Sequence, residues 1–334
     1  MSFDRIIAQP SAVRTLSRSV TGERVASAYL FEGPTGVGKQ LAATELARAL
    51  VCAQRPRVCE GTCDMCRRLL AGTHPDFRVF GPRDEGNRNI QVEVLRGEIL
   101  PIAQFAPFEA PAAMLLFPDA DVSFPPNHPE AANALLKTLE EPRERVHFVL
   151  LSSRPERLLP TIRSRCQSVR FHRLPPSVIE RILSEHGVLE DHWPLAVALA
   201  DGRADVALEL AASGTAEQVL GAAMRVDAAV TSGGPGALVT LAEELARDDG
   251  LERALLALAT FYRDVAACSL GADPHRLVLR HQVEAVEQRA ATLSAADAAA
   301  RVELLHRTID SFERNANRQL ALDALLFELR LGAA

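Results

Sequence analysis

This sequence of 334 residues contains few aromatic residues and no long apolar run, and its net charge is negative. Only 5% of the residues are aromatic, while Ala and Leu are frequent, and this balance favours helices over sheets wherever packing leaves the choice open. We therefore expect the second half of the chain to be nearly all helix.

The apolar residues are spread along the chain, and nowhere do the roughly 18 consecutive ones needed for a membrane span occur. Residues Met1 to Arg5 also lack the basic region and apolar run of a secretory signal. These absences predict a cytoplasmic protein with no membrane partner. With 48% apolar and 24% charged residues, the chain has enough apolar surface for two or three globular domains.

The formal net charge is −6, so the protein as a whole would repel DNA phosphate unless basic residues gather on one face. Protein partners are therefore expected rather than independent DNA binding.

Short apolar runs alternate with longer helical stretches between Phe3 and Phe171. The runs that read as buried strands lie at 28–31, 114–117, 146–151 and 168–171. Such alternation is typical of an α/β domain with a parallel sheet. Residues 174–177, with the sequence LPPS, then predict a linker in which Ser177 caps the next helix.

Turn residues interrupt the helical second half at 213–214 and again at 232–236. A short helical segment is expected to end near Leu210, and a helical bundle is expected from about Ala212. In the final helix one apolar stripe is predicted at i, i+3, i+4 and i+7, formed by Leu322, Leu325, Leu326 and Leu329.

A phosphate-binding loop follows the first predicted strand. Residues 33–40 read GPTGVGKQ and precede a helix that begins near Leu41, which is the strand, loop and helix order of a Walker A motif. Gly33, Gly36 and Gly38 would let backbone amides face a phosphate, and Lys39 would reach the outer phosphates. The sequence therefore predicts a P-loop fold, and nucleotide binding is a separate question.

Both groups that would hold Mg²⁺ in such a site are altered. Gln40 stands where Ser or Thr would supply a hydroxyl ligand. The strand at 114–117 is followed by residues 118–121, with the sequence PDAD. In one register Asp119 is the metal-binding Asp, and Ala120 stands in place of the catalytic Glu. In the other register Asp119 occupies the position of the Glu. We favour the first register, and neither one supplies an Asp-Glu pair. A strand-end Asp that only caps a turn is the structural alternative.

Four of the six cysteines lie directly after the P-loop helix, at Cys52, Cys59, Cys63 and Cys66. In a reducing compartment this density favours a metal over disulfides. Four thiolates can close a tetrahedron around Zn²⁺, and a site with no open position is structural rather than catalytic. We predict a structural zinc that holds an insertion at 52–66 with little core of its own. Four reduced thiols in a loop are the alternative.

The P-loop, the cysteine cluster and several further runs resemble the clamp-loader subunits of bacterial DNA polymerase III, which are AAA+ proteins. The runs are GTHPD at 72–76, IQVEVLR at 90–96, NALLKTLEEP at 133–142, SRC at 164–166 and NANRQLAL at 315–322. Together with the turn signals, the resemblance implies an α/β P-loop AAA+ domain with a parallel sheet at 1–173, a small helical lid domain at 174–211 and an all-α collar domain at 212–334.

Within that family, the delta-prime subunits resemble this chain more than the ATPase subunits, which keep the Walker A hydroxyl and an acidic Walker B pair. This resemblance implies a degenerate nucleotide site, with ATP or ADP binding left open, and a retained arginine finger. Arg165 would then enter the ATP site of a neighbouring subunit, while a local ion pair is the alternative. The chain departs from the family at Asp205, where an Arg is expected in the lid, and at a longer, Pro-rich segment, 122–130.

The implied function is to help load a sliding clamp onto primed DNA. The implied partners are the ATPase subunits and delta in a hetero-oligomeric ring, with clamp and DNA reached through the complex. An active ATPase of the same loader is a second hypothesis, against which Gln40 and the missing acidic pair argue. A DNA-repair or checkpoint AAA+ protein is a third, which the cysteine cluster and the last helix disfavour.

Overall fold

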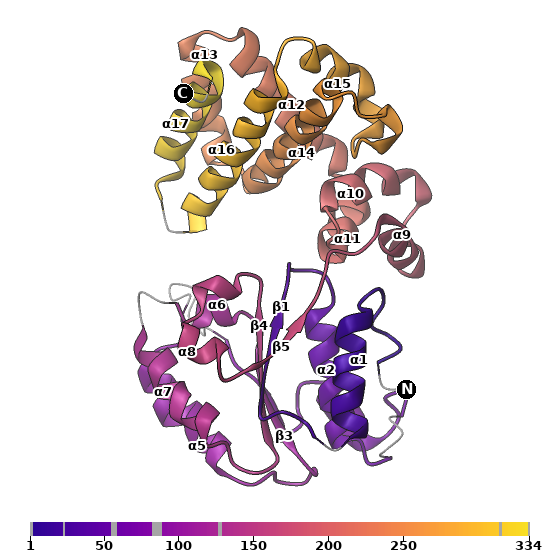
Figure 1. Ribbon diagram of the computed structural model, residues 1–334, viewed down its shortest axis with the longest axis vertical. Helices are drawn as coiled ribbons and strands as arrows, with labels where there is room; N and C mark the ends of the chain where they lie inside the picture. Colours follow the sequence, from indigo (N-terminus) through magenta and orange to yellow (C-terminus); the bar gives the residue numbers. More distant parts are fainter. Residues whose placement is uncertain are drawn as a thin grey trace. The chain divides into compact units, whose positions relative to one another are not determined.

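The structure is a computed structural model, and it describes residues 3–22, 24–54, 59–81, 89–125, 129–313 and 316–332 (Figure 1). Parts of three predicted features lie outside the described residues. They are 55–58 of the zinc insertion, 126–128 of the Pro-rich segment and residue 315 of the C-terminal run.

The chain divides into two compact units. Unit 1 comprises residues 1–178 and 202–205, and unit 2 comprises residues 179–201 and 206–334. Most of the predicted lid therefore belongs to the same unit as the predicted collar, and a separation of the two at 211/212 stays a prediction. Among the described residues, no helix combines the length and the apolar character that crossing a bilayer requires.

Unit 1 contains a five-stranded parallel sheet with the strand order β2-β3-β4-β1-β5. The strands are β1 (Ala28–Glu32), β2 (Phe77–Val79), β3 (Ala113–Phe117), β4 (Val146–Ser152) and β5 (Gln167–Arg170). The strand β1 lies between β4 and β5 in this order, with Leu30 opposite Leu150 of β4 and Ser168 of β5. Because the strands are parallel, the segments that follow β1, β3 and β4 meet at one edge of the sheet, where the P-loop lies.

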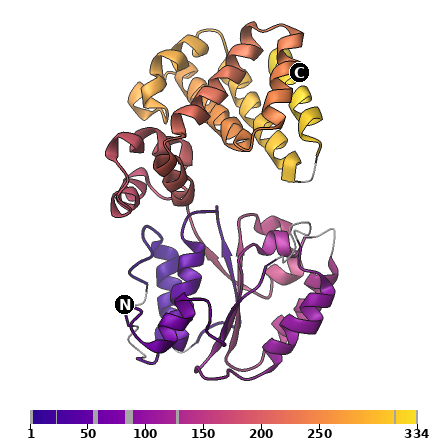
Figure 2. The same ribbon diagram turned by 180° about the vertical axis from the view of Figure 1, so that it is seen from behind.

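Alternate residues of the strands form separate cores on the two faces of the sheet. Tyr29 and Phe31 pack with residues of α1 (Pro10–Thr21) and α2 (Lys39–Val51) on one face. Leu30 and Phe117 pack with residues of α7 (Pro129–Glu140) on the other. Both views of the molecule show these helices on opposite sides of the sheet (Figure 1, Figure 2). The near-continuous apolar sequences of β1, β3 and β4 follow from this coverage, since both faces of these strands are packed, whereas the edge strands β2 and β5 keep exposed residues.

The remaining helical segments of unit 1 connect the strands. They are α3 (Asp64–Leu70), α4 (Val92–Val94), a π-helical turn (Leu95–Ile99), α5 (Leu100–Gln104), α6 (Ala120–Ser123), a 3₁₀ turn (Pro155–Arg157) and α8 (Pro160–Arg163).

Unit 2 is helical throughout its described residues. Its helices are α9 (Pro176–Glu185, whose first turn lies in unit 1), α10 (Trp193–Ala200), α11 (Ala204–Ser213), α12 (Ala216–Ser232), α13 (Pro235–Ala246), α14 (Leu251–Ser269), α15 (Val283–Ala290), α16 (Ala295–Glu313) and α17 (Arg318–Leu331), with 3₁₀ turns at Glu190–His192, Pro274–Arg276 and Arg280–Gln282.

The long helix α14 packs against α12, α15 and α16, and α13 packs against α17. A buried polar cluster joins these helices: Tyr262 donates to Asp227 (2.6 Å), and Arg301 donates to the Tyr262 hydroxyl (2.8 Å). Such a hydrogen-bonded cluster favours one packing arrangement of α12, α14 and α16 over others.

The structure confirms the four predicted strands, the helical second half, and the breaks near 213–214 and 232–236. It also confirms the apolar stripe of the last helix, whose four leucines are all buried. Two details differ. The strand β2 has only three residues, too few to show a periodicity, and Ser177 lies inside α9, which begins at Pro176, rather than at its cap.

Candidate nucleotide and metal sites

The predicted P-loop connects β1 to α2 and has the backbone of a phosphate-binding loop. Gly33, Gly36 and Gly38 have φ angles of 144°, 68° and 96°, in the region that favours glycine. A Cβ on Gly33 would also meet the carbonyl oxygen of Phe171 at 2.3 Å, so only glycine fits this close approach to β5. The sequence therefore supplies glycine where this backbone needs it.

Lys39 turns toward its own loop. Its ammonium donates hydrogen bonds to the carbonyl oxygens of Gly33 and Pro34, both at 2.5 Å. Burial lowers the pKa of Lys39 to about 8, although the nearby carboxylates of Asp121 and Asp119 act in the opposite direction. The cation that would reach a phosphate is thus held by backbone carbonyls of the loop.

Asp205 lies against the same loop. A Cβ placed on Gly36 would fall 1.8 Å from Oδ1 of Asp205, which means that the carboxylate packs directly on the glycine. The backbone N–H of Ala204 also donates to the carbonyl oxygen of Gly36 (3.0 Å). A carboxylate therefore lies directly against the loop that would bind phosphate.

The carboxylates after β3 lie close enough to Lys39 to affect its charge. Asp119 directly precedes α6, and burial together with the neighbouring charge of Asp121 raises its pKa. Asp121 is buried and accepts hydrogen bonds from the backbone and hydroxyl of Ser153 (3.3 and 3.4 Å). Gln40, the second residue of α2, is exposed. Sequence reasoning gave no role to Asp121, whose only signal was its place two residues after Asp119.

Arg165 lies in the short segment that connects α8 to β5. Its guanidinium donates to Glu140 of α7 (Nε to Oε1, 2.7 Å) and to the carbonyl oxygen of Thr161 (2.8 Å). The side chain keeps 31% of its exposure. The next residue, Cys166, has its pKa raised to about 12 by burial, so it is an unreactive thiol.

The four predicted cysteine ligands converge at the C-terminal end of α2. Their sulfur atoms all lie within 4.8 Å of one another, and the Sγ atoms of Cys52 and Cys63 are 3.9 Å apart. A tetrahedral ion with metal–sulfur bonds of about 2.3 Å would place its ligands about 3.8 Å apart. The arrangement can therefore hold a metal ion of this kind.

Backbone amides also point at the cysteine sulfurs. The N–H groups of Gln54 and Cys59 donate to Cys52 (3.4 and 3.5 Å), and the N–H of Cys66 donates to Cys63 (3.4 Å). Burial raises the pKa of Cys59, but hydrogen bonds from the Cys63 amide and thiol and the Gly61 amide outweigh it and lower the pKa to about 5. Such donors favour the thiolate, which is the form that binds metal.

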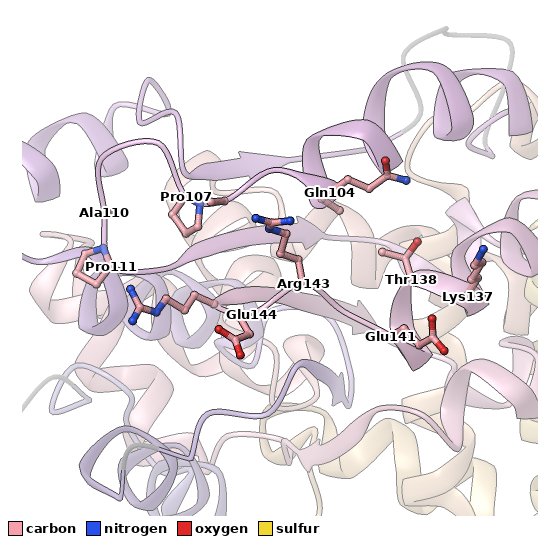
Figure 3. Close-up of a pocket in the computed structure, with 12 residues that line it drawn as sticks. Gln104, Pro107, Ala110, Pro111, Lys137, Thr138, Glu141, Arg143 and Glu144 are labelled. Carbon is pink, nitrogen blue, oxygen red and sulfur yellow. The ribbon is translucent and has the colours of Figure 1, made fainter.

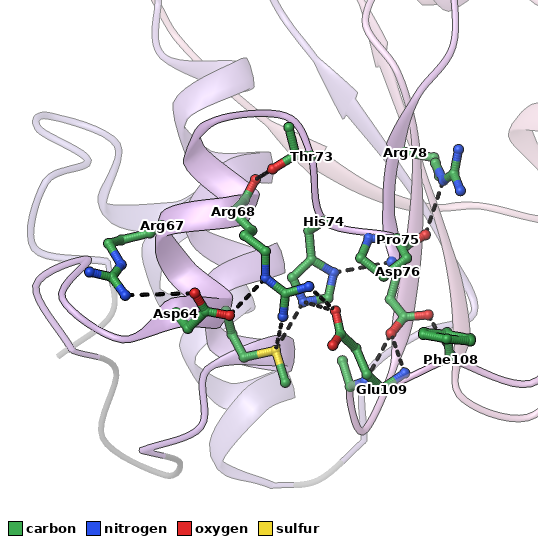
Figure 4. A network of polar contacts seen from close by, with 12 residues as sticks. Asp64, Arg67, Arg68, Thr73, His74, Pro75, Asp76, Arg78, Phe108 and Glu109 are labelled. Carbon is green, nitrogen blue, oxygen red and sulfur yellow. Dashed lines mark hydrogen bonds and ion pairs between the residues drawn. The ribbon is translucent and has the colours of Figure 1, made fainter.

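A polar network holds the outer side of α3 next to the cysteines (Figure 4). Arg68 pairs with Glu109 (2.6 Å) and with Asp64 (2.8 Å). His74 contacts the sulfur of Met65 through Nε2 (3.3 Å) and accepts from the backbone of Asp76 through Nδ1 (3.1 Å). Burial lowers the pKa of His74, which disfavours a charged ring, and the residue lies in the segment between α3 and β2 rather than among the four sulfurs.

Asp76 orders the loop on the far side of this network. Its carboxylate accepts three backbone hydrogen bonds at 2.5–2.9 Å, from Phe108, Glu109 and Ala110. A cavity of about 940 Å³ lies next to this loop (Figure 3). Its lining mixes Pro107 and Pro111 with charges of both signs, among them Lys137, Glu141 and Arg143. These residues do not include any of the predicted nucleotide or metal ligands.

Two family models match most of the chain. The model described as "DNA polymerase III, delta subunit" matches residues 8–175, and the one described as "DNA polymerase III, delta subunit, C terminal" matches residues 227–330.

Curated relatives carry similar names. The DNA polymerase III subunit delta' of Bacillus subtilis is 36% identical over 181 residues, which are 54% of this chain and 52% of the relative. The subunit delta' of Pseudomonas aeruginosa is 42% identical over 143 residues, 42% of each chain. Subunit gamma/tau of Mycobacterium tuberculosis is 33% identical over 209 residues, 60% of this chain and 35% of the relative.

The matches to the delta' relatives thus span about half the length of those proteins or less. The first family model, however, covers half of this chain, including the P-loop, the cysteine cluster and the SRC run. This chain belongs to the DNA polymerase III delta-subunit family and resembles its delta' members.

Proposed function

We propose that this chain is a clamp-loader subunit of DNA polymerase III that helps load the sliding clamp onto primed DNA. In this proposal it works in a hetero-oligomeric ring with the ATPase subunits and delta, and meets clamp and DNA through the complex. The observation that carries it is the family match over residues 8–175, which includes the whole α/β domain. Cytoplasmic residence is a prediction that accompanies this function.

The nucleotide site of the chain is proposed to be degenerate. Phosphoryl transfer in P-loop proteins depends on Mg²⁺ held by a hydroxyl of the loop and by a carboxylate after the neighbouring strand. Here Gln40 replaces the hydroxyl, Lys39 bonds to its own loop, and the carboxylate of Asp205 lies on Gly36. Each of these features disfavours bound MgATP. Binding of ATP or ADP without turnover remains compatible with the proposal.

Arg165 is proposed to act on a neighbouring subunit as an arginine finger. A guanidinium stays charged at any physiological pH and can stabilise the negative charge that develops on a transferring phosphoryl group. The partial exposure of the side chain supports this role, because the group can exchange Glu140 for a phosphate without unfolding the chain. The ion pair with Glu140 keeps the guanidinium in a fixed orientation before that exchange.

Replacing Arg165 by Ala tests the central mechanistic claim. The variant is expected to fold and assemble, since most surface changes cost no more than about 0.5 kcal/mol. The clamp- and DNA-stimulated ATPase of the reconstituted loader should fall strongly, because arginine fingers contribute about 10³ to 10⁵ in rate in GTPase systems. Arg163→Ala, an exposed arginine two residues away, is the matched control. Equal hydrolysis by both variants at equal assembly would leave Arg165 as part of an ordinary ion pair.

The four cysteines are proposed to bind one structural Zn²⁺. The donor set supports zinc, since four thiolates with no open position suit a tetrahedral ion that does no chemistry. When bound, the ion would supply a cross-link between the end of α2, at Cys52, and α3, at Cys66. Metal analysis of the purified chain should find one zinc per chain.

An active ATPase subunit of the same loader is the second candidate. The observation in its favour is that Lys39 and the carboxylates of Asp119 and Asp121 are grouped at the P-loop. Steady-state ATP hydrolysis by the isolated chain that disappears in Lys39→Ala would support it. Hydrolysis at background level in both proteins supports the degenerate site instead.

A further inference from the structure

A buried ion pair on α2 lies beside the cysteine cluster. Glu45 and Arg48 are 1% and 4% exposed, and Nη1 of Arg48 donates to both carboxylate oxygens at 2.8 Å. Removing two charges from water is costly, and a buried pair by itself is a weak source of stability. The remaining contacts of the guanidinium therefore indicate why the pair is there.

One of those contacts is with the cysteine cluster. Nη2 of Arg48 donates to the carbonyl oxygen of Cys59, and the charge of the guanidinium acts on the thiol of Cys66. Arg5 also approaches Glu45 (Nη1 to Oε1, 3.2 Å). Two arginines and one glutamate thus form a group with net positive charge, and Arg48 is its member that bonds to the cluster.

A Zn²⁺ ion bound by four thiolates carries net negative charge, and burying it requires compensation. A guanidinium beside the ligand sulfurs supplies this compensation. Its hydrogen bond to the Cys59 carbonyl orients that ligand, which lies between α2 and α3. One side chain of the P-loop helix thereby acts on two of the four metal ligands, Cys59 through a hydrogen bond and Cys66 through its charge.

We propose that Arg48 is a positioning residue of the metal site, which offsets the charge of the thiolate cluster and aligns Cys59, while Glu45 holds the guanidinium in its orientation. This inference rests on the proposed zinc site. It adds a link between the metal site and the P-loop, since Arg48, which would support the metal, lies on the helix that begins at the P-loop.

The test uses the double variant Glu45→Gln/Arg48→Met, because a single replacement would leave an unpaired buried charge. Zinc content is measured by metal analysis, and zinc release to an excess of chelator is followed with a coloured indicator. Changes to groups that support metal ligands typically cost about 10- to 100-fold in metal affinity, so the double variant should release zinc about 10- to 100-fold faster. Arg67→Met is the matched control, since Arg67 lies on the helix of Cys66 but its side chain is 67% exposed and pairs with Asp64 on the surface.

The outcomes separate this inference from the zinc site itself. Wild-type chain without zinc overturns the metal site. Wild-type chain with zinc, and a double variant that releases it at the wild-type rate, overturns the role of Arg48 and leaves the zinc site standing. If circular dichroism shows that the double variant does not fold, Arg48→Lys decides, because it keeps the charge but loses the fork of donors. Zinc release faster than wild type in that variant supports the inference, and release at the wild-type rate contradicts it.

Discussion

The two ends of helix α2 differ in how their polar groups are satisfied. At the N-terminal end, Lys39 binds carbonyls of its own loop and the carboxylate of Asp205 packs on Gly36. At the C-terminal end, four sulfurs converge at ligand distance, and Arg48 and backbone amides donate to the cysteines. The comparison teaches that at one end of a helix the polar groups bond to the chain itself, while at the other end four thiols are arranged so that they can hold an ion.

Removing a cysteine should have the largest effect on this comparison. In Cys66→Ser we expect zinc content to fall from one per chain to near zero, since Cys66 is fully buried in the cluster. In zinc-finger peptides the metal contributes about 10–16 kcal/mol of binding free energy that is also folding free energy, so the segment around Cys59 to Cys66 should lose its amide-exchange protection. Cys268→Ser, outside the cluster, should change neither quantity. Zinc retained in Cys66→Ser would mean that a different ligand set binds the metal.

Replacing Asp205 should have an intermediate effect at the other end of the helix. Two like charges about 4 Å apart repel by about 4 kcal/mol at an effective dielectric constant of about 20. Removing the carboxylate should therefore tighten binding of a fluorescent ADP analogue by at least about tenfold. Asp205→Asn keeps the size of the side chain and Asp205→Ala does not, so the pair separates charge from bulk. If neither variant binds more tightly than wild type, the carboxylate is not what excludes nucleotide.

The smallest expected effect concerns the pH dependence of stability at Lys39. Its pKa is lowered from 10.5 in the unfolded chain to about 8 in the folded protein, chiefly by burial. Between these values the unfolded chain binds more protons, so the contribution of Lys39 to the free energy of unfolding rises with pH. The stability of Lys39→Met relative to wild type should then be highest below pH 8 and decline as the pH approaches 10.5, as urea unfolding at several pH values would show. A difference that does not vary with pH would mean that the burial of Lys39 does not disfavour its charge.

Much of the fold could be predicted because its signals are local. Apolar runs mark β1, β3 and β4 since both faces of these strands are covered, and the glycines of the P-loop mark backbone that other residues adopt poorly. The short strand β2 left no pattern in the sequence, because three residues are too few for a periodicity and its pairing depends on β3.

The sequence by itself determined which groups are present: the Walker A backbone, the missing hydroxyl at Gln40, and four thiols at metal-binding spacing. Only the tertiary structure decided which groups meet. Asp205 reaches Gly36, Glu140 reaches Arg165, and Arg48 reaches Cys59 because packing brings distant or differently facing segments together. Spacing along a chain specifies contacts within a turn or a loop, whereas a contact between elements depends on how the cores of both faces fill space.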